Sequence, residues 1–335
     1  MVLRLGALAV AFGGLSGCAP ARQAALDPPA PEGAPAFHPD EGVFVSFDGA
    51  RLGLTVWPSR TGAPEIVVVG LHGMNDYANA FHMAAPSWAE RGVTGCAYAQ
   101  RGHGRSRRRG IWAEQALLRR DLRTAVEVAR SRHPDAVLAV VGISMGGAVA
   151  MTEFARADAP QIDRLILSAP ALRGWEALPW IQRVALRLSA HVRPGWRVVP
   201  PRRFIRIEPS DNIEMLRRLV ADPLRLDGNR IDMVLGVVEL MSAARFAAAD
   251  LRPPTLAAYG QKDIVIPASA MREAAPRFPD HVRTVYYSEG YHMLLRDLQA
   301  ETVWADYLAF LRDADATLPS GAPSWPWRRG EAPDG

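Results

Sequence analysis

The stretch that decides the fold is AVLAVVGISMGGAVAMTEFARA, residues 136–157 of this 335-residue chain. Its first six residues are a continuous apolar run, which is typical of a strand buried on both faces of a parallel sheet. Residues 148–157 have a helical pattern. Between the two, Gly142-Ile143-Ser144-Met145-Gly146 has the form Gly-x-Ser-x-Gly. A strand that turns sharply into a helix through this motif exposes the serine hydroxyl, so we predict that Ser144 is a nucleophile.

Strand-like and helical segments alternate on both sides of this stretch. A helical pattern covers 114–130, and Asp48-Gly49 marks a hairpin between 43–47 and 52–57. This alternation predicts a mostly parallel, doubly wound α/β sheet. Residues 171–253 lack convincing strands, which predicts a helical cap inserted into the sheet domain. The remaining predicted strands are 65–71, 93–98, 164–168, 255–259 and 283–287.

Composition and charge indicate one globular catalytic domain between two flexible ends. Hydrophobic residues make up 49% of the chain and charged residues 22%, which excludes a disordered or polytopic membrane protein. The net charge of +4 is small for 335 residues, and the basic run at 105–109 is short, so we expect no nucleic acid partner. Residues 19–40 form a predicted Pro/Ala-rich tether, 41–315 the catalytic domain and 316–335 a flexible tail.

The first 18 residues have the features of a lipoprotein signal peptide. A basic start at 1–4 precedes 13 apolar and small residues at 5–17. As a helix these would span about 20 Å, too short for a hydrocarbon core of about 30 Å. Leu15-Ser16-Gly17-Cys18 resembles a bacterial lipobox, which implies lipidation of Cys18 and a lipid-anchored protein of the cell envelope, with the outer membrane as one destination. The alternative is an ordinary secretory signal cut near Ala19 or Ala21.

Two residues complete a predicted triad with Ser144. Asp263 follows the predicted strand at 255–259, and His292 follows the one at 283–287. In the order Ser…Asp…His, each residue lies on a loop after the end of a strand. His292 would accept the Ser144 proton, and Asp263 would hold the imidazole in the required tautomer. Asp280 and Asp297 are the competing candidates for the acid.

The oxyanion donors and the absence of a cofactor also follow from motifs. Met145 follows the nucleophile, and Met74 follows His72-Gly73 at the end of the predicted strand at 65–71. Their amides are the expected pair of oxyanion donors. We expect a structural role for His72. No metal-ligand spacing and no nucleotide-binding loop occurs in the sequence, so no metal or cofactor is expected.

The chain resembles the monoacylglycerol lipase/lysophospholipase group of serine α/β-hydrolases over about residues 40–312. The resemblance implies an α/β-hydrolase fold with a cap, the triad Ser144, Asp263 and His292, and oxyanion amides at Met74 and Met145. The group's usual Glu-His after His-Gly is replaced by Asn75-Asp76, which leaves the substrate within the group open. The motifs that carry the resemblance are His72-Gly73, QRGHGRS at 100–106, GISMGG at 142–147, Asp263 and GYH at 290–292.

The cap contains an apolar stripe that includes Ile181, Val184 and Leu188 at helical spacing. The stripe either packs on the catalytic domain or roofs the site of a substrate acyl chain. The resemblance implies a serine ester hydrolase acting on monoacylglycerols, lysophospholipids or similar lipid-like esters. The alternatives are an aminopeptidase-like amide hydrolase on the same fold and a catalytically silent envelope binding protein. The sequence leaves the oligomeric state open.

Overall fold

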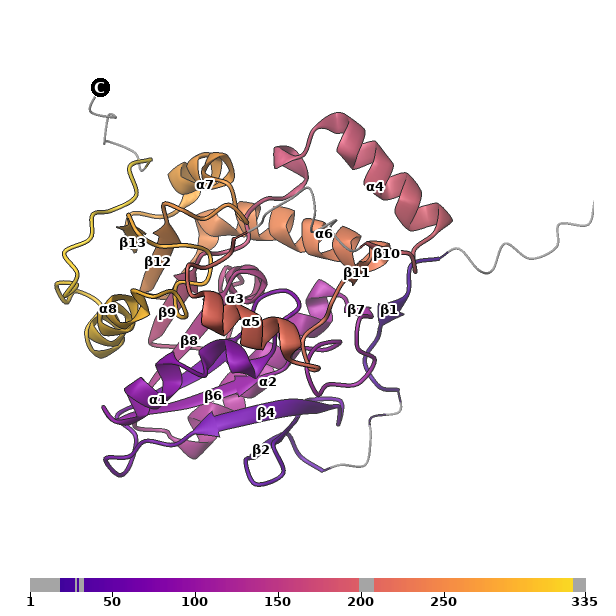
Figure 1. The fold of residues 1–335 in the computed structure, drawn as a ribbon. Coiled ribbons are helices and arrows are strands. Elements are labelled where there is room, and N and C mark those ends of the chain that lie inside the picture. Colours follow the sequence, from indigo (N-terminus) through magenta and orange to yellow (C-terminus); the bar gives the residue numbers. More distant parts are fainter. Residues whose placement is uncertain (1–18, 28, 30–32, 199–207, 328–335) are drawn as a thin grey trace, which may run out of the picture.

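The computed structural model describes residues 19–27, 29, 33–198 and 208–327. Its centre is a nine-stranded sheet in the order β13-β12-β9-β8-β5-β6-β4-β3-β2 (Figure 1). The strands from β13 to β6 are parallel, and β4, β3 and β2 continue the sheet antiparallel. The predicted mostly parallel sheet is therefore confirmed. The strands are β2 (Ala36–His38), β3 (Val43–Val45), β4 (Arg51–Trp57), β5 (Ile66–Leu71), β6 (Val93–Tyr98), β8 (Val137–Ile143), β9 (Arg164–Ser168), β12 (Thr255–Gly260) and β13 (Val282–Tyr287).

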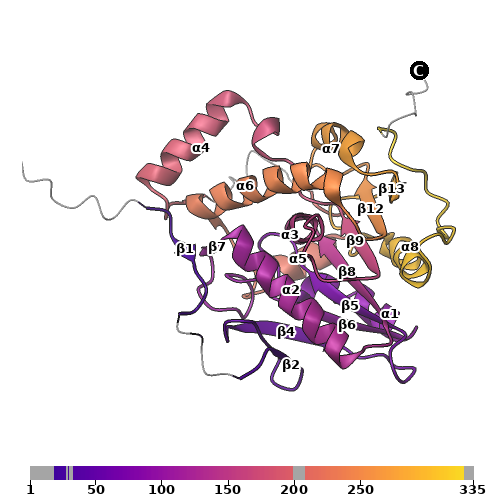
Figure 2. The same cartoon turned by 180° about the vertical axis from the view of Figure 1, so that it is seen from behind.

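Helices cover both faces of the sheet, because the central strands are apolar on both sides. Along β5, Ile66 and Val68 join one hydrophobic cluster, whereas Val67 and Val69 join another. Alternate residues of a strand point to opposite faces, so each cluster fills one face. The first cluster packs under α1 (Ala84–Ala89) and α8 (Ala300–Arg312), and the second under α2 (Gln115–Arg132) and α3 (Met145–Phe154) (Figures 1 and 2).

The cap lies between β9 and β12. It consists of α4 (Trp180–Val192), α5 (Ile213–Ala221) and α6 (Ile231–Ala247), with a short antiparallel pair of β10 (Arg197–Val198) and β11 (Asn229–Arg230). Met233, Leu240 and Ala244 of α6 are buried in the hydrophobic cluster that also contains α3. The cap therefore rests on the helix that follows Ser144. None of the described helices is both long and apolar enough to cross a bilayer.

The expectation of a free tether at 19–40 is wrong for its described part. β1 (Arg22–Gln23) pairs in parallel with β7 (Trp112–Ala113), and β2 is the outermost strand of the main sheet. Phe37 in β2 is buried against the ring of Phe44. Composition misleads here because one aromatic residue and a few backbone pairs suffice to hold a segment that is otherwise rich in proline and alanine.

The expectation of a loose tail at 316–335 is also wrong for residues 316–327. The Tyr286 N–H donates to the Pro323 carbonyl, and the Trp325 ring N–H donates to the Val285 carbonyl. These bonds cover β13, the open edge of the sheet, whose backbone groups would otherwise be unpaired. Trp325 is completely buried, with its ring edge-on to Phe278. Its apolar area outweighs the irregular, proline-rich sequence around it.

Replacing Trp325 with alanine should lower the free energy of unfolding by about 3–5 kcal/mol, because a large buried ring leaves a cavity. The matched control is Trp196→Ala, since the Trp196 side chain is exposed and should change stability by less than about 0.5 kcal/mol. Equilibrium denaturation of both variants measures the difference. Equal stabilities would mean that residues 316–327 do not belong to the folded core.

Candidate active site

Ser144 lies on a strained turn between β8 and α3. Its backbone has φ 49° and ψ −112°, a conformation that non-glycine residues rarely adopt and that is typical of functional sites. The neighbouring glycines are sterically required. A Cβ on Gly146 would lie 2.3 Å from the Leu71 carbonyl oxygen, and one on Gly142 would lie 2.7 Å from the Gly147 Cα. The turn is therefore tight because the helix must begin directly against the neighbouring strands.

Asp263 and His292 are hydrogen-bonded to each other at the carboxyl ends of the parallel strands. Asp263 follows β12 and His292 follows β13, and their Oδ2 and Nδ1 atoms are 2.7 Å apart. The other carboxylate oxygen of Asp263 accepts the N–H groups of Val265 and Ile266 at 2.8 and 2.9 Å. Because Nδ1 donates to the carboxylate, Nε2 of His292 is left as an acceptor. The pair can therefore take a proton from a hydroxyl group that approaches Nε2.

Ser144 lies on the same side of the sheet as this pair. It follows the carboxyl end of β8, and β8, β9, β12 and β13 are successive parallel strands. Ser144 and His292 are both largely buried, at 8% and 7% exposure. No hydrogen bond among the described residues joins the serine hydroxyl to the imidazole. Such bonds often tighten only when substrate is bound, and the arrangement otherwise has the order and loop positions that a nucleophile and its base require.

The loop after β5 runs directly beside the nucleophile. A Cβ on Gly73 would lie 3.3 Å from the Ser144 Cβ, so only a glycine allows this approach without displacement. Met74 is the next residue, and its N–H donates to no described residue. Met145 is the first residue of α3, where backbone N–H groups lack an intrahelical acceptor. The two amides predicted to stabilise an oxyanion are thus available on either side of Ser144.

His72 has a structural role. Its Nε2 accepts the Gln100 N–H at 2.9 Å, and its Nδ1 donates to the Gly73 carbonyl at 2.7 Å. Burial lowers the pKa of His72, and burial together with His72 lowers the pKa of His103 to about 3. Both imidazoles are therefore neutral, and His72 ties the loop after β5, which carries Met74 and which we call the oxyanion loop, to Gln100. The part of the chain that the structure describes contains no cluster of metal-ligating side chains.

An ion pair between Asp76 and Arg296 was not anticipated from the sequence. The Arg296 Nη2 lies 2.5 Å from the Asp76 Oδ2, and both side chains are buried. The pair joins the oxyanion loop to the loop that carries His292. Asp76 lies in the stretch in which this chain departs from the monoacylglycerol lipase pattern. That departure is the only feature of the sequence that pointed to an unusual contact here. Its partner is 220 residues away.

Asp297, a competing candidate for the triad acid, contacts the backbone rather than the imidazole. Its Oδ2 accepts the Tyr291 N–H at 2.8 Å, one residue before His292. Burial raises the pKa of Asp297 to about 6. Asp280, the other competitor, is not paired with His292, whose Nδ1 is bound to Asp263. The geometry therefore favours Asp263 as the acid.

The raised pKa of Asp297 predicts a pH-dependent stability. Above about pH 6 the folded protein holds a buried charge, and below about pH 4 the group is protonated in both folded and unfolded chains. Asp297→Asn should therefore raise the free energy of unfolding near pH 8 by up to about 3 kcal/mol, with the gain vanishing as the pH falls to 4. Urea denaturation at several pH values measures this gain. A gain independent of pH would contradict the raised pKa.

The apolar stripe of α4 does not pack on the catalytic domain. Ile181, Val184 and Leu188 are 62%, 54% and 60% exposed. Their periodicity correctly predicted a shared helix face, but the helix is turned so that this face points outward. A separate cavity of about 280 Å³ lies beside Met74 and the His292 loop, under α5. It is lined by Met74, Asn75, Asp76, Pro209, Leu216, Leu219, Val220, Arg225 and Met293.

Known proteins resemble this chain in sequence and in fold. A monoacylglycerol lipase from Mycolicibacterium smegmatis is 26% identical over 271 residues, which cover 80% of this chain and 95% of that protein. A soluble variant of the Saccharomyces cerevisiae monoglyceride lipase has a similar structure, with a TM-score of 0.70, 18% identity, and coverage of 86% of this chain and 100% of that one. A carboxyl esterase from Bacillus coagulans gives a TM-score of 0.64 at 18% identity, over 81% and 96% of the two chains.

These structural likenesses confirm the α/β-hydrolase fold that the family resemblance implied. The sequence pattern of the serine aminopeptidase S33 family matches residues 62–299, most of the chain. The matched region contains the nucleophile turn, the oxyanion loop, the cap and both loops of the Asp263–His292 pair. By this match the chain belongs to the serine aminopeptidase S33 family.

Proposed function

We infer that the protein is a serine hydrolase of carboxylic esters. This function rests on one observation: the strained Ser144 turn and the Asp263–His292 pair lie together at the carboxyl ends of the parallel strands. The named relatives, a monoacylglycerol lipase and a carboxyl esterase, support ester chemistry. A substrate ester would enter with its carbonyl carbon facing the Ser144 hydroxyl.

The mechanism follows from the positions of these groups. Ser144 Oγ forms a bond to the carbonyl carbon while its proton passes to His292 Nε2. The amides of Met74 and Met145 stabilise the negative oxygen of the tetrahedral intermediate. The bond to the alcohol then breaks, and His292 returns the proton to the leaving oxygen. A water molecule then attacks the acyl-enzyme while its proton passes to His292 Nε2. The bond between the acyl group and Ser144 Oγ breaks, the fatty acid leaves, and His292 returns the proton to Ser144.

We propose that the acyl group is lipid-like, as in a monoacylglycerol or a lysophospholipid. The cavity under α5 begins at Met74, one of the two oxyanion positions, and Leu216, Leu219 and Val220 supply an apolar wall. Each buried methylene group of the substrate contributes about 0.8 kcal/mol. Four added carbons would therefore contribute about 3 kcal/mol, or roughly a hundredfold in kcat/KM, until the cavity is full.

A chain-length series tests this acyl site. Leu216→Gln places an amide in the cavity wall and should lower the ratio of kcat/KM for a decanoyl ester to that for an acetyl ester. Val184→Gln makes the same kind of change on the exposed stripe of α4, the other candidate for contact with the chain. A ratio that falls only in the α4 variant would move the acyl site to α4. A ratio unchanged in both would contradict an apolar acyl site.

Amide hydrolysis is the second candidate, since the family takes its name from an aminopeptidase. An aminopeptidase needs a free carboxylate near the nucleophile to bind the substrate ammonium group. Asp76 lies beside the oxyanion loop, but its charge is already paired with Arg296. The geometry thus favours esters. The rates of hydrolysis of a decanoyl ester and an aminoacyl anilide test this preference. Covalent labelling by a fluorophosphonate tests the alternative of a catalytically silent binding protein.

We propose that Cys18 is lipidated and anchors the protein in the bacterial envelope. Cys18 lies outside the described residues, so the lipobox-like LSGC sequence supports this proposal. The intact mass of the mature protein should correspond to cleavage before Cys18 plus attached acyl chains. Cys18→Ser should be found either soluble or uncleaved. A mutant that fractionates and migrates as the wild type would contradict the anchor.

A further inference from the structure

The loop that carries His292 contains no helix or strand of its own. Residues 288–299, between the end of β13 and the start of α8, form only turns and bends. The position of His292 therefore depends on the contacts that this loop makes with other parts of the chain. Asp263 holds the imidazole itself, but the backbone around the imidazole needs further support.

The cap supplies such support through residues 209–212, directly before α5. The Pro209 carbonyl accepts the Met293 N–H at 2.9 Å. The Asp211 Oδ1 accepts the Leu298 N–H at 2.8 Å. These two hydrogen bonds fasten the cap to the His292 loop near both the base and the start of the next helix.

Asn212 makes a third contact, and its side chain is bonded through both of its polar atoms. The Oδ1 accepts the Met215 N–H at 3.1 Å and thereby caps the N-terminus of α5. The Nδ2 donates to the Arg296 carbonyl at 3.0 Å. A backbone N–H can only donate and a carbonyl can only accept, so the amide is needed for both bonds. An aspartate would cap the helix equally well, so capping alone does not account for asparagine.

Arg296 connects this contact to the rest of the site. Its guanidinium pairs with Asp76 of the oxyanion loop, while its backbone carbonyl is held by Asn212. Both charged side chains of the pair are buried. The His292 loop, the oxyanion loop and the cap therefore meet at one residue.

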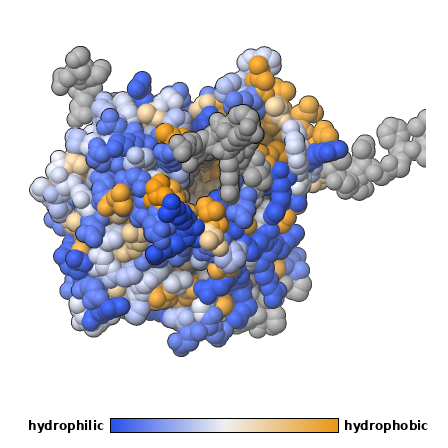
Figure 3. Space-filling model, in the orientation of Figure 1, coloured by the Kyte–Doolittle hydropathy of each residue, from blue (hydrophilic) through white to orange (hydrophobic). Residues whose placement is uncertain are grey.

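Asn212 also begins the helix that forms a wall of the acyl cavity. Leu216 and Leu219 of α5 line that cavity. The outer side of the helix is hydrophilic (centre of Figure 3) and carries Glu214, Arg217 and Arg218. Because α5 is fastened to the His292 loop at its first turn, the wall of the acyl cavity and the catalytic base are held in one arrangement.

We propose that Asn212 is a positioning residue for His292. It acts through the backbone of Arg296 and does not touch the substrate. This inference rests on the proposed ester hydrolysis. Because a displacement of about 1 Å can cost about a hundredfold in rate, loss of the bond from Asn212 should lower kcat. Binding of the acyl chain should change little, since the apolar wall of α5 remains.

Two variants remove the donor and keep the helix cap. Asn212→Asp retains an oxygen for the Met215 N–H, and a carboxylate is favourable at a helix N-terminus, but it has no hydrogen to give to the Arg296 carbonyl. Asn212→Ser caps the helix with a side chain that is one bond shorter and adds no charge.

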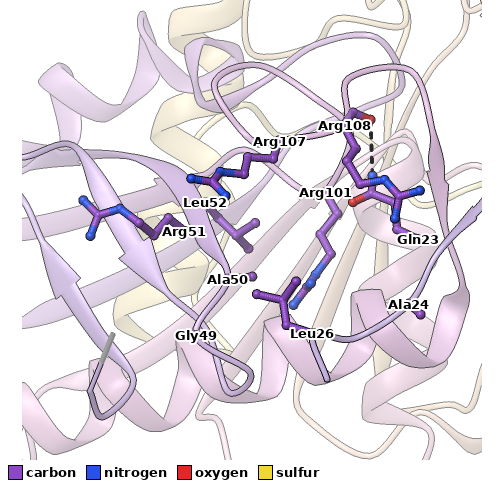
Figure 4. A pocket seen from close by; sticks show the side chains of 10 residues that line it. All are labelled: Gln23, Ala24, Leu26, Gly49, Ala50, Arg51, Leu52, Arg101, Arg107 and Arg108. Atoms are coloured by element: carbon purple, nitrogen blue, oxygen red, sulfur yellow. Dashed lines mark hydrogen bonds between the residues drawn. The ribbon is translucent and has the colours of Figure 1, made fainter. Parts of the chain in front are cut away.

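The matched control is Gln23→Glu. The buried Gln23 amide also donates to backbone carbonyls, those of Ile111 and Arg108, beside a separate pocket of about 270 Å³ (Figure 4). None of the residues that line this pocket lines the acyl cavity. The control makes the same change from amide to carboxylate, so it shows the general effect of losing such a donor.

The measurements are kcat and KM for a decanoyl ester, the melting temperature, and the rate at which a fluorophosphonate labels Ser144. We expect kcat and the labelling rate to fall by roughly 10–100-fold in both Asn212 variants, with KM little changed. Neither rate should fall in Gln23→Glu.

An unchanged kcat in both Asn212 variants would overturn the proposal. So would a loss that Gln23→Glu shares, or one that follows a fall in melting temperature, because the role of Asn212 would then be structural. Labelling needs an activated serine but no ester. A wild type that is labelled but hydrolyses no ester would therefore contradict the proposed function, while the labelling rates would still test the positioning by Asn212.

Discussion

Alanine in place of Ser144 should lower kcat for an acyl ester by about 10⁴–10⁶-fold, the order of magnitude seen when a serine hydrolase loses a residue of its triad. Without the hydroxyl no acyl-enzyme can form, and only the oxyanion amides and substrate binding remain. The fold should survive, because α3 and β9 hold the turn through the backbone: the Ser144 N–H donates to Ser168, and the Ser144 carbonyl accepts from Ala148 and Ala171.

The measurement is the initial rate of hydrolysis of a saturating ester by the variant and by the wild type. Ser131→Ala, at an exposed position in the last turn of α2, is the control for a serine lost elsewhere and should keep wild-type activity. Equal melting temperatures would show that the loss is not due to unfolding. A Ser144→Ala protein that keeps most of its activity would contradict the assignment of the nucleophile.

Asn in place of Asp263 should lower kcat by about 10⁴-fold, as the same change does in a serine protease triad. The carboxylate holds the proton on Nδ1 of His292, and an amide nitrogen facing that atom would favour the other tautomer. Nε2 would then carry the proton and could not accept one from Ser144. The two backbone N–H bonds to the Asp263 Oδ1 can be kept by the amide oxygen, so the loop should stay in place.

The control for this variant is Asp297→Asn, which changes a buried carboxylate on the same loop system without touching the imidazole. We expect kcat to fall far less in Asp297→Asn than in Asp263→Asn. Rates should be measured at saturating substrate and at the same pH for all proteins. A larger loss in the Asp297 variant would make Asp297 the triad acid and Asp263 a structural residue.

The sequence predicts the sheet and the triad because both depend on local patterns. Gly142 is required by the turn itself, since a Cβ there would meet Gly147, and Gly146 is required where the start of α3 meets the neighbouring strand β5. Asp263 and His292 each follow a strand directly. Since parallel strands have their carboxyl ends on the same side of the sheet, residues that directly follow such strands lie on that side.

The remaining features depend on contacts between distant residues. Trp325 is buried against β12 and β13, and Arg296 pairs with Asp76, but neither contact leaves a periodic trace in the sequence. The stripe at Ile181, Val184 and Leu188 was visible as a helix face, yet periodicity does not say whether such a face points inward or outward. That direction follows from the other side of the helix, where Ala190 is buried and Arg183 donates to the Leu178 carbonyl.

The most direct test of the account is to find the atom that carries the acyl group. The wild-type protein is treated with a fluorophosphonate that bears a long alkyl chain, digested, and analysed by mass spectrometry. We predict one adduct on the peptide that contains Ser144, and its absence in both Ser144→Ala and the heat-denatured wild type. An adduct at another serine, or no adduct in a protein that still hydrolyses esters, would contradict a mechanism based on Ser144.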